Sequence, residues 1–163
     1  MARTNADPEL ILERIAARLI DQLEGVSAAN CFAVLAPTRD AVPNAADFIY
    51  HVSLVSGQFD SGAFDGGGNE QATVHAQLAV TIWSTRDLDQ VGRDRKFLVD
   101  PGLGLLPKAK KVLLALSGHD LEDESGNELL DQPFFPADFH IERLERNLGS
   151  IQIGFSIVFD WDL

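Results

Sequence analysis

Cysteine is nearly absent from this chain of 163 residues, which contains only Cys31. A single thiol cannot close an internal disulfide, and it cannot supply a zinc site built from several cysteines. Positive charge is also scarce, because 13 Lys and Arg residues stand against 25 Asp and Glu residues, for a formal net charge of −12. Nucleic acids and anionic membranes are bound through basic surfaces, so neither is expected as the primary partner.

Long hydrophobic runs and phosphate-binding motifs are missing as well. No apolar run approaches the roughly 20 residues that a membrane-spanning helix needs, so no membrane partner is expected. Residues 1–5 contain no hydrophobic signal core, which predicts a protein made in the cytosol. Gly66-Gly67-Gly68 is followed by neither a Lys-Ser/Thr pair nor a helix, so it does not predict a phosphate-binding loop.

The sequence does have the composition of a folded domain. Hydrophobic residues make up 45% and charged residues 23%, as in soluble globular proteins, and the length predicts a single domain over residues 1–163. The first element is a helix from about Asp7 to Glu24, with Asp7 as its N-cap, Pro8 in its first turn and Gly25 at its end. Its apolar stripe consists of Ile11, Ile15, Leu19 and Leu23.

Short apolar or alternating runs predict the strands of a sheet. These runs cover residues 31–35, 47–55, 73–83, 139–146 and the C-terminal stretch from residue 151. In 73–83 and in the C-terminal stretch every second residue is apolar, which indicates one buried face and one face toward water or a partner. The apolar face of the C-terminal strand consists of Ile151, Ile153, Phe155, Ile157, Phe159 and Trp161.

A glycine-rich segment separates the second and third of these strands. Gly57–Gly68 holds five of the 13 glycines of the chain, together with Phe59 and Phe64. Glycine backbone costs much entropy to order, so this arm, at about residues 56–70, is expected to be the mobile tip of a long hairpin. Two phenylalanines are unusual in a segment that only contacts water.

The middle of the chain predicts two helices, at 87–99 and 105–116, followed by an acidic linker at about residues 119–136. Most of the part from residue 119 to residue 131 is expected to be exposed turn. The pair Phe134-Phe135 lies between Pro133 and Pro136, in a segment not expected to form a core strand. The order of elements predicts an α+β fold, in which a mainly antiparallel β-sheet packs against an N-terminal helix and central helices, with a long Gly-rich hairpin arm.

Candidate chemical sites are few. His51 and His75 could face each other on the outer side of adjacent strands and bind a metal with a carboxylate, although exposed strand histidines are commoner. Asp160 and Asp162 form a carboxylate pair, whose usual role at a strand end is solubility and edge protection. Cys31 lies among apolar residues and is interpreted as a small core side chain. We therefore predict no catalytic residue, cofactor or metal site, and a protein that is not an enzyme.

The phenylalanine pairs leave two interpretations open. In the first, the side chains fold back on the core of their own chain. In the second, they dock on another subunit, because exposed aromatic residues commonly mark interfaces. The interface candidates are Phe59, Phe64, Phe134 and Phe135.

As a whole, the pattern resembles the tail terminator (tail completion) proteins of tailed bacteriophages and related phage-tail-like particles. The resemblance lies in the size of the chain and in the order of its elements, without a catalytic motif. Those elements are the opening helix Glu9–Glu24, the hairpin around Gly57–Gly68, the helical middle Asp87–Leu116 and the C-terminal strand Gly149–Trp161.

The resemblance implies a structural role in the tail or neck of a virion assembled in the host cytoplasm. Proteins of this family form a ring, typically a hexamer, on the head-proximal end of the tail tube, where they stop tube growth and contact neck or head-completion proteins. DNA would pass through the lumen of such a ring, and acidic residues lining it would repel phosphates. Two groups of lumen candidates remain open: Asp60, Asp65 and Glu70, or Glu122, Asp123 and Glu124.

Two rival functions also remain open. One is another tail-tube or neck component, such as a tube protein or a head–tail connector. The other is a small-molecule or metal enzyme whose site lies on the outer face of the sheet.

Overall fold

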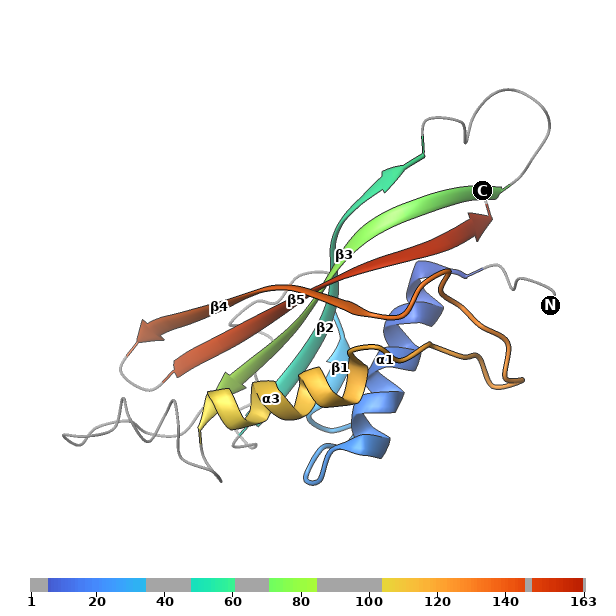
Figure 1. Cartoon of the computed structure of the whole chain (residues 1–163). Coiled ribbons are helices and arrows are strands. Elements are labelled where there is room, and N and C mark those ends of the chain that lie inside the picture. Colours follow the sequence, from blue (N-terminus) through green and yellow to red (C-terminus); the bar gives the residue numbers. More distant parts are fainter. Residues whose placement is uncertain (1–5, 35–47, 61–70, 85–103, 146–147, 163) are drawn as a thin grey trace.

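Among the residues that the structure describes, a twisted five-stranded sheet with two helices on one face forms the framework (Figure 1). The computed structural model describes residues 6–34, 48–60, 71–84, 104–145 and 148–162. Helix α1 (Pro8–Gln22) and helix α3 (Leu105–Leu116) lie next to each other, α1 over one side of the sheet and α3 over its middle. No helix among the described residues has the length and apolar character to cross a membrane.

The sheet has the strand order β1-β2-β3-β5-β4 and is mainly antiparallel. β1 (Cys31–Ala33) pairs in parallel with β2 (Phe48–Phe59), whereas β3 (Gln71–Ser84) pairs antiparallel with both β2 and β5 (Leu148–Asp162). β4 (Phe135–Glu145) pairs only with β5 in this sheet, so it is an edge strand. The α+β fold predicted from the order of elements is confirmed.

Helix α1 begins as its sequence predicts. The carboxylate of Asp7 accepts a hydrogen bond from the backbone N–H of Glu9 at 2.9 Å, and Pro8 occupies the first helical position. Gly25, beyond the helix end, has a φ of +79°, which a glycine adopts without steric cost. The N-cap therefore defines where α1 begins, and with it which residues of the apolar stripe face the sheet.

The core lies between the helices and the sheet face that they cover. Because side chains alternate along a strand, the register brings every second residue of β2, β3 and β5 to this face. From α1 and α3 the core receives Ile11, Ile15, Leu19, Leu105, Val112 and Leu116. From the strands it receives Tyr50, Val52, Leu78, Val80, Ile153, Phe155 and Phe159, so the face predicted for the C-terminal strand is the buried one.

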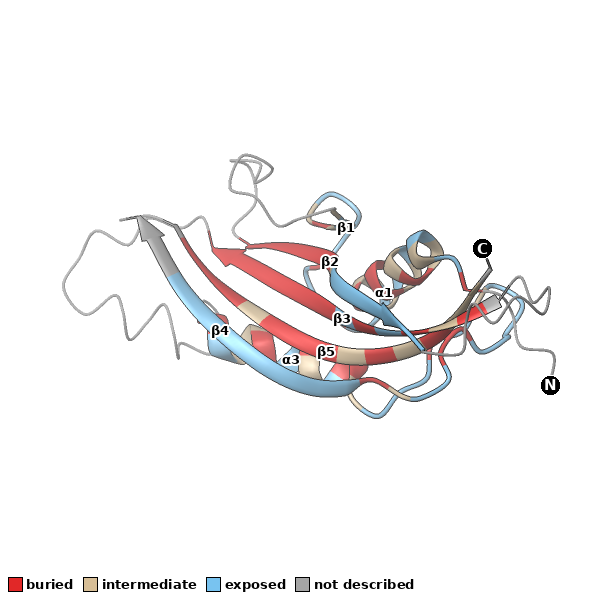
Figure 2. Cartoon of the chain, turned by 90° about the horizontal axis from the view of Figure 1, so that it is seen from above, coloured by how far each residue is buried: buried red, intermediate tan, exposed pale blue. Residues whose placement is uncertain are grey.

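The second face of the sheet differs from its prediction. It was expected to contact water or a partner, yet its part around His51, Thr81 and Trp83 is buried (Figure 2). Farther along β3, His75 and Gln77 on the same face are exposed. Alternation in the sequence identifies the two faces, but it does not reveal that one region of the second face is also covered.

Several element boundaries were also predicted wrongly. β1 ends at Ala33, and β4 begins at Phe135, four residues before its predicted start at residue 139. The segment before residue 139 was not expected to form a core strand, and β4 is an edge strand. Most of the linker to residue 131 is exposed, as predicted, although Leu121, Leu129 and Leu130 are buried. Helix 105–116 has the predicted bounds, whereas the helix predicted at 87–99 and the arm tip at 61–70 lie outside the described residues.

Candidate assembly surface

The edge strand β4 carries large apolar side chains that are not buried. Phe139 and Ile141 are 67% and 37% exposed, and in register they lie opposite Ile153 and Ile151 of β5, which are buried. Phe139 and Ile141 therefore point to the face that carries the helices. Figure 2 shows the contrast between the exposed β4 and the buried strands beside it.

The width of the helix layer explains this exposure. Neighbouring strands lie roughly 4.8 Å apart, whereas packed helices lie about 8–10 Å apart, so two helices cover about four strands. Here α1 packs on β1 and β2, and α3 packs on β3 and β5. β4, the fifth strand, extends beyond the helices and leaves its apolar face open.

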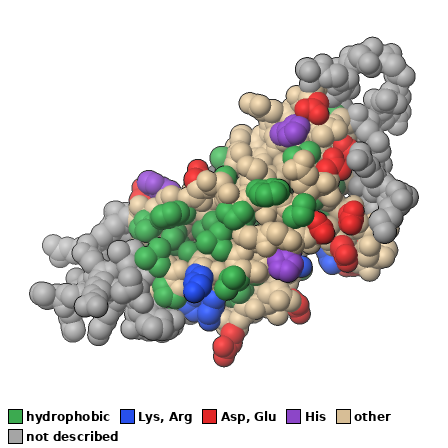
Figure 3. All heavy atoms as spheres, in the orientation of Figure 1, with side chains coloured by type: hydrophobic (Ala, Val, Ile, Leu, Met, Phe, Trp, Pro, Cys, Tyr) green, Lys and Arg blue, Asp and Glu red, His purple; other side chains and the backbone are tan. Residues whose placement is uncertain are grey.

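A groove runs between α3 and β4. It has a volume of about 280 Å³, and apolar side chains from both elements and from β5 form most of its lining. Lys110 of α3 also lines the groove, and Leu106 of the same helix is partly exposed. Figure 3 shows hydrophobic side chains gathered over this part of the molecule, with basic side chains beside them. We call this the β4–α3 surface, defined by Leu106, Ala109, Lys110, Leu113, Phe139 and Ile141.

The opposite edge of the sheet has a second groove. Its volume is about 440 Å³, and its lining comes from α1, β1, the residue after β1, and β2. Glu9 and Leu12 stand on α1 at this groove, and the neighbouring Val55 of β2 is exposed. We call it the α1–β1 groove, defined by Pro8, Glu9, Leu12, Ala33, Val34 and Leu54.

Side-chain contacts link neighbouring strands of the sheet at the base of the arm. Phe59 stacks on Trp161 with ring centroids 6.1 Å apart, which leaves Phe59 43% exposed. His75 Nε2 lies 2.9 Å from Asp60 Oδ1, and the Thr73 hydroxyl donates to Asp160 Oδ1 at 2.7 Å. These contacts connect β2, β3 and β5 at the last described residues before the arm tip.

The two histidines considered for a metal site do not meet. His51 lies opposite Thr81 in the β2–β3 register, whereas His75 lies opposite Gln58. Six residues of β3 separate these two rows, which corresponds to about 20 Å of extended strand. The idea that they face each other is therefore wrong, and the described residues contain no group of three or more metal-ligating side chains.

His51 instead belongs to a buried polar cluster. The indole Nε1–H of Trp83 donates to His51 Nδ1 at 3.1 Å, and the ring of Phe32 lies 5.1 Å from the imidazole ring. Burial lowers the pKa of His51, because it disfavours the charged imidazolium. A neutral imidazole that accepts at Nδ1 carries its proton on Nε2, so this histidine is a structural hydrogen-bond acceptor for Trp83.

The other chemical candidates are also structural. Cys31 is buried, its Sγ lies 3.8 Å from the carbonyl of Ala16, and burial raises the pKa of its thiol to about 12. Such a thiol is not a reactive thiolate at neutral pH. Asp160 of the predicted carboxylate pair is bonded to Thr73, and the side chain of Asp162 lies outside the described residues.

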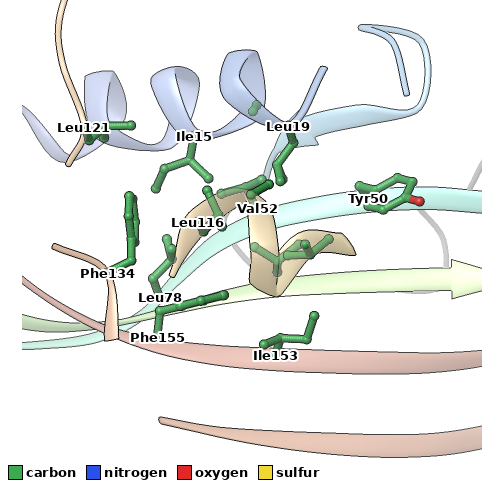
Figure 4. Packing of buried hydrophobic residues seen from close by; sticks show 14 of the residues in the cluster. Ile15, Leu19, Tyr50, Val52, Leu78, Leu116, Leu121, Phe134, Ile153 and Phe155 are labelled. Atoms are coloured by element: carbon green, nitrogen blue, oxygen red, sulfur yellow. The ribbon is translucent and has the colours of Figure 1, made fainter. Parts of the chain in front are cut away.

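The phenylalanine pair at 134–135 divides between the two interpretations. Phe134 is 1% exposed and packs edge-to-face on Phe155, with centroids 6.1 Å apart and an interplanar angle of 79°. It lies in the core near α1 and α3 (Figure 4), which excludes it as an interface residue. Phe135 is 58% exposed on the second face, opposite Ser156, and stays an interface candidate. Phe64 lies outside the described residues.

The acidic candidates lie at two separate places. Asp60 is exposed at the base of the arm, while Asp65 and Glu70 lie outside the described residues. In the linker Glu122 and Glu124 are exposed. Asp123 accepts hydrogen bonds from the side chain and backbone N–H of Asn127 and from the N–H of Ser125.

These bonds to Asp123 lower its pKa, the side-chain hydrogen bond from Asn127 most of all. The Asp123 carboxylate thus holds the backbone of the acidic turn in place through its hydrogen bonds.

Sequence reasoning missed Phe139, Ile141 and Leu106 as candidate interface residues. Phe139 and Ile141 alternate with His140 and Glu142, which is the pattern of any half-buried strand.

Comparison with known proteins adds one remote likeness. No family model matches the chain, and no curated protein matches it. Among solved structures it is similar to a chain of "Virion of native gene transfer agent (GTA) particle", with 15% identity and a TM-score of 0.44 over 78% of this chain and 77% of that chain. A TM-score of this size carries no argument about fold or function.

Proposed function

We propose that this protein is a structural protein of a phage-like particle and that it acts as a tail terminator. Copies of the chain form a ring, typically a hexamer, on the head-proximal end of the tail tube and connect the tube to the neck. Its partners are other copies of itself, the tail tube protein and a neck or head-completion protein. The protein works in the tail or neck of the virion after assembly in the host cytoplasm.

The observation that carries an assembly role is the open β4–α3 surface. An edge strand with exposed apolar side chains is a hazard for a protein that stays alone in solution, because it can pair with other chains. Such a surface is normal in a subunit whose neighbours cover it. Phe139, at 67% exposure, gives the clearest indication that this chain works in contact with other chains.

The order of elements supports the finer role. A helix, a long β2–β3 hairpin, a central helix and a long C-terminal strand follow one another, which is the order of elements that carries the resemblance to tail terminator proteins. The β2–β3 hairpin extends past the helices with exposed residues on β2 (Figure 1), which suits contact with a neighbouring subunit or the tube.

The acidic composition is consistent with a channel for DNA. With a net charge of −12, a ring can expose carboxylates to its lumen and keep phosphates from adhering. Asp60 at the arm base and Glu122 and Glu124 in the linker are exposed and available for this purpose. An enzyme on the outer face has less support, since His51 is used structurally and is far from His75.

Deletion of the gene in the producing strain, followed by electron microscopy of the particles, tests the proposal. A terminator is required to stop tube growth, so we expect tubes of irregular length that are not joined to heads. Complementation with the unaltered gene should restore particles with uniform tails.

The same experiment separates the rival structural roles. Loss of all tubes would indicate a tube protein, and tubes of uniform length without heads would indicate a neck connector. Normal particles from the deletion strain would overturn a structural role in the virion altogether.

A further inference from the structure

We propose that copies of this chain associate head-to-tail, with the β4–α3 surface of one copy seated on the α1–β1 groove of the next. This inference rests on the proposed function, because it names the two surfaces through which a ring would form. It commits to a second copy of this chain as the occupant of both surfaces.

The position of the two surfaces supports a head-to-tail contact. β1 and β4 are the opposite edges of one sheet. Two different surfaces on opposite sides of a subunit make a heterologous interface, which closes into a ring when the rotation per subunit allows. A contact between two identical surfaces would instead stop at a dimer.

The two surfaces match in their apolar character. Phe139 and Ile141 project from β4 beyond the helix layer. The α1–β1 groove is a concave surface with Leu12, Val34 and Leu54 in its lining. Burial of the Phe139 side chain in such a groove would remove its exposed apolar surface from water, which favours association.

The charged side chains at the two surfaces have opposite signs. Lys110 lines the β4–α3 groove and is exposed to solvent, whereas Asp138, at the β4 side of the groove, has its carboxylate on the second face beside Gly154. Glu9 lines the α1–β1 groove, and Glu13 lies one turn farther on the same side of α1. Head-to-tail contact places Lys110 against these glutamates, which favours this pairing and speeds association.

Charge also disfavours the symmetric alternative. If two β4–α3 surfaces met, Lys110 of one copy would lie near Lys110 of the other across an apolar contact. If two α1–β1 grooves met, Glu9 would face Glu9. Like charges at an interface oppose binding, so the heterologous arrangement is the one that both surfaces support.

A mixing experiment with two blocked variants tests the arrangement. Phe139→Asp places a carboxylate at the exposed centre of the β4–α3 surface, and Ala33→Arg places a long cation at an exposed position in the α1–β1 groove. Native mass spectrometry and light scattering should show rings for the unaltered chain and monomers for each variant alone. A mixture of the two variants should give dimers, because one intact pair of surfaces remains.

A charge exchange tests the pairing residue by residue. Lys110→Glu and Glu9→Lys alone should each raise the concentration needed for assembly at least about tenfold, and the double variant should regain most of this loss. Glu24→Lys, the same charge change just beyond α1, is the matched control and should leave assembly unchanged. Thermal melts of the separated monomers check that every variant is folded.

The possible failures are distinguishable. Dimers of Ala33→Arg alone would mean that β4–α3 surfaces pair symmetrically, which overturns the inference. Rings that survive both blocking variants, or an unaltered chain that stays monomeric at all concentrations, would also overturn it. The proposed function is tested by the particle morphology of the deletion strain, which does not depend on these assembly results. Failure of this inference can therefore be distinguished from failure of the proposed function.

Discussion

β5 and β4 are neighbours in the same sheet and have similar sequence patterns, yet their apolar side chains have opposite surroundings. On the helix face of β5, Ile153 and Phe155 are fully buried, whereas Phe139 of β4 is 67% exposed. The two strands differ in position: β5 is an inner strand that α3 packs on, whereas β4 is the edge strand beyond the described helices. Apolar alternation thus gives the orientation of side chains, while the placement of the helices decides which strands are covered.

The largest expected effect comes from the buried strand. Phe155→Ala removes a fully buried side chain that contacts Phe134, and we expect a loss of about 3–5 kcal/mol in the free energy of unfolding because a cavity remains. Urea denaturation followed by circular dichroism measures this loss. Ser156→Ala, the next residue on the opposite face, is the control and should cost about 0.5 kcal/mol or less. Equal costs would contradict the assignment of faces.

A smaller effect is expected where β5 and β4 touch on the second face. Gly154 has no side chain, and a Cβ added there would collide with the carboxylate of Asp138 on β4. Gly154→Ala should therefore cost about 1 kcal/mol or less, because the exposed Asp138 side chain must rotate away but can do so at small cost. The double variant Gly154→Ala with Asp138→Ala removes the obstacle and should regain most of the loss. Additive costs in this double-mutant cycle would show that the contact is unimportant.

The counterpart of the first variant on the edge strand should have little effect on folding. Phe139→Ala removes the same side chain type as Phe155→Ala, but from an exposed position. We expect the unfolding free energy of the monomer to fall by about 1 kcal/mol or less. The same urea denaturation measures this change, at a protein concentration too low for the chains to assemble. A cost close to that of Phe155→Ala would mean that β4 is covered within its own chain.

The smallest expected effect is a dependence of the unfolding free energy on pH, caused by His51. On the second face, a row of paired residues crosses the sheet from the buried His51 through Thr81 and Gln152 to His140. Burial lowers the pKa of His51 below its usual 6.5, so the unfolded chain takes up this proton more readily than the folded one. The stability that depends on neutral His51 is present above about pH 6.5 and decreases as the pH falls below it.

Denaturation at about pH 7.5 and about pH 5.5 measures this dependence. His51→Asn keeps an acceptor for Trp83 without a titrating group, so it should lose less stability on acidification than the unaltered chain does. His140→Asn is the matched control, because His140 is exposed at the other end of the row. An unchanged pH dependence in His51→Asn would contradict the burial of this histidine.

The sequence predicts most elements but few of their contacts. Helix 105–116 and the buried face of the C-terminal strand follow from periodicity alone, because local spacing determines both. The start of β4 at Phe135 was not predicted, because Pro133 and Pro136 suggested a break. Only Pro136 lies within β4, which tolerates it because β4 is an edge strand.

The candidate site was less accessible to sequence reasoning than the fold. Phe134 and Phe135 are adjacent and identical in type, yet one is in the core and the other is exposed. The burial of each side chain depends on where the chain enters β4, which is determined by the tertiary fold. The same holds for His51, whose partner Trp83 is 32 positions away and becomes visible only through the strand register.

The end of α3 illustrates how one long-range contact can order events in folding. This helix has no basic residue in its own last turn, and the guanidinium Nε–H of Arg18 on α1 donates to the carbonyl of Ala115 at 2.7 Å. The positive charge that stabilises the C-terminus of α3 therefore comes from a residue 97 positions earlier in the chain. We expect the last turn of α3 to become persistent only after α1 has docked, so that amide hydrogen exchange there slows together with that of α1.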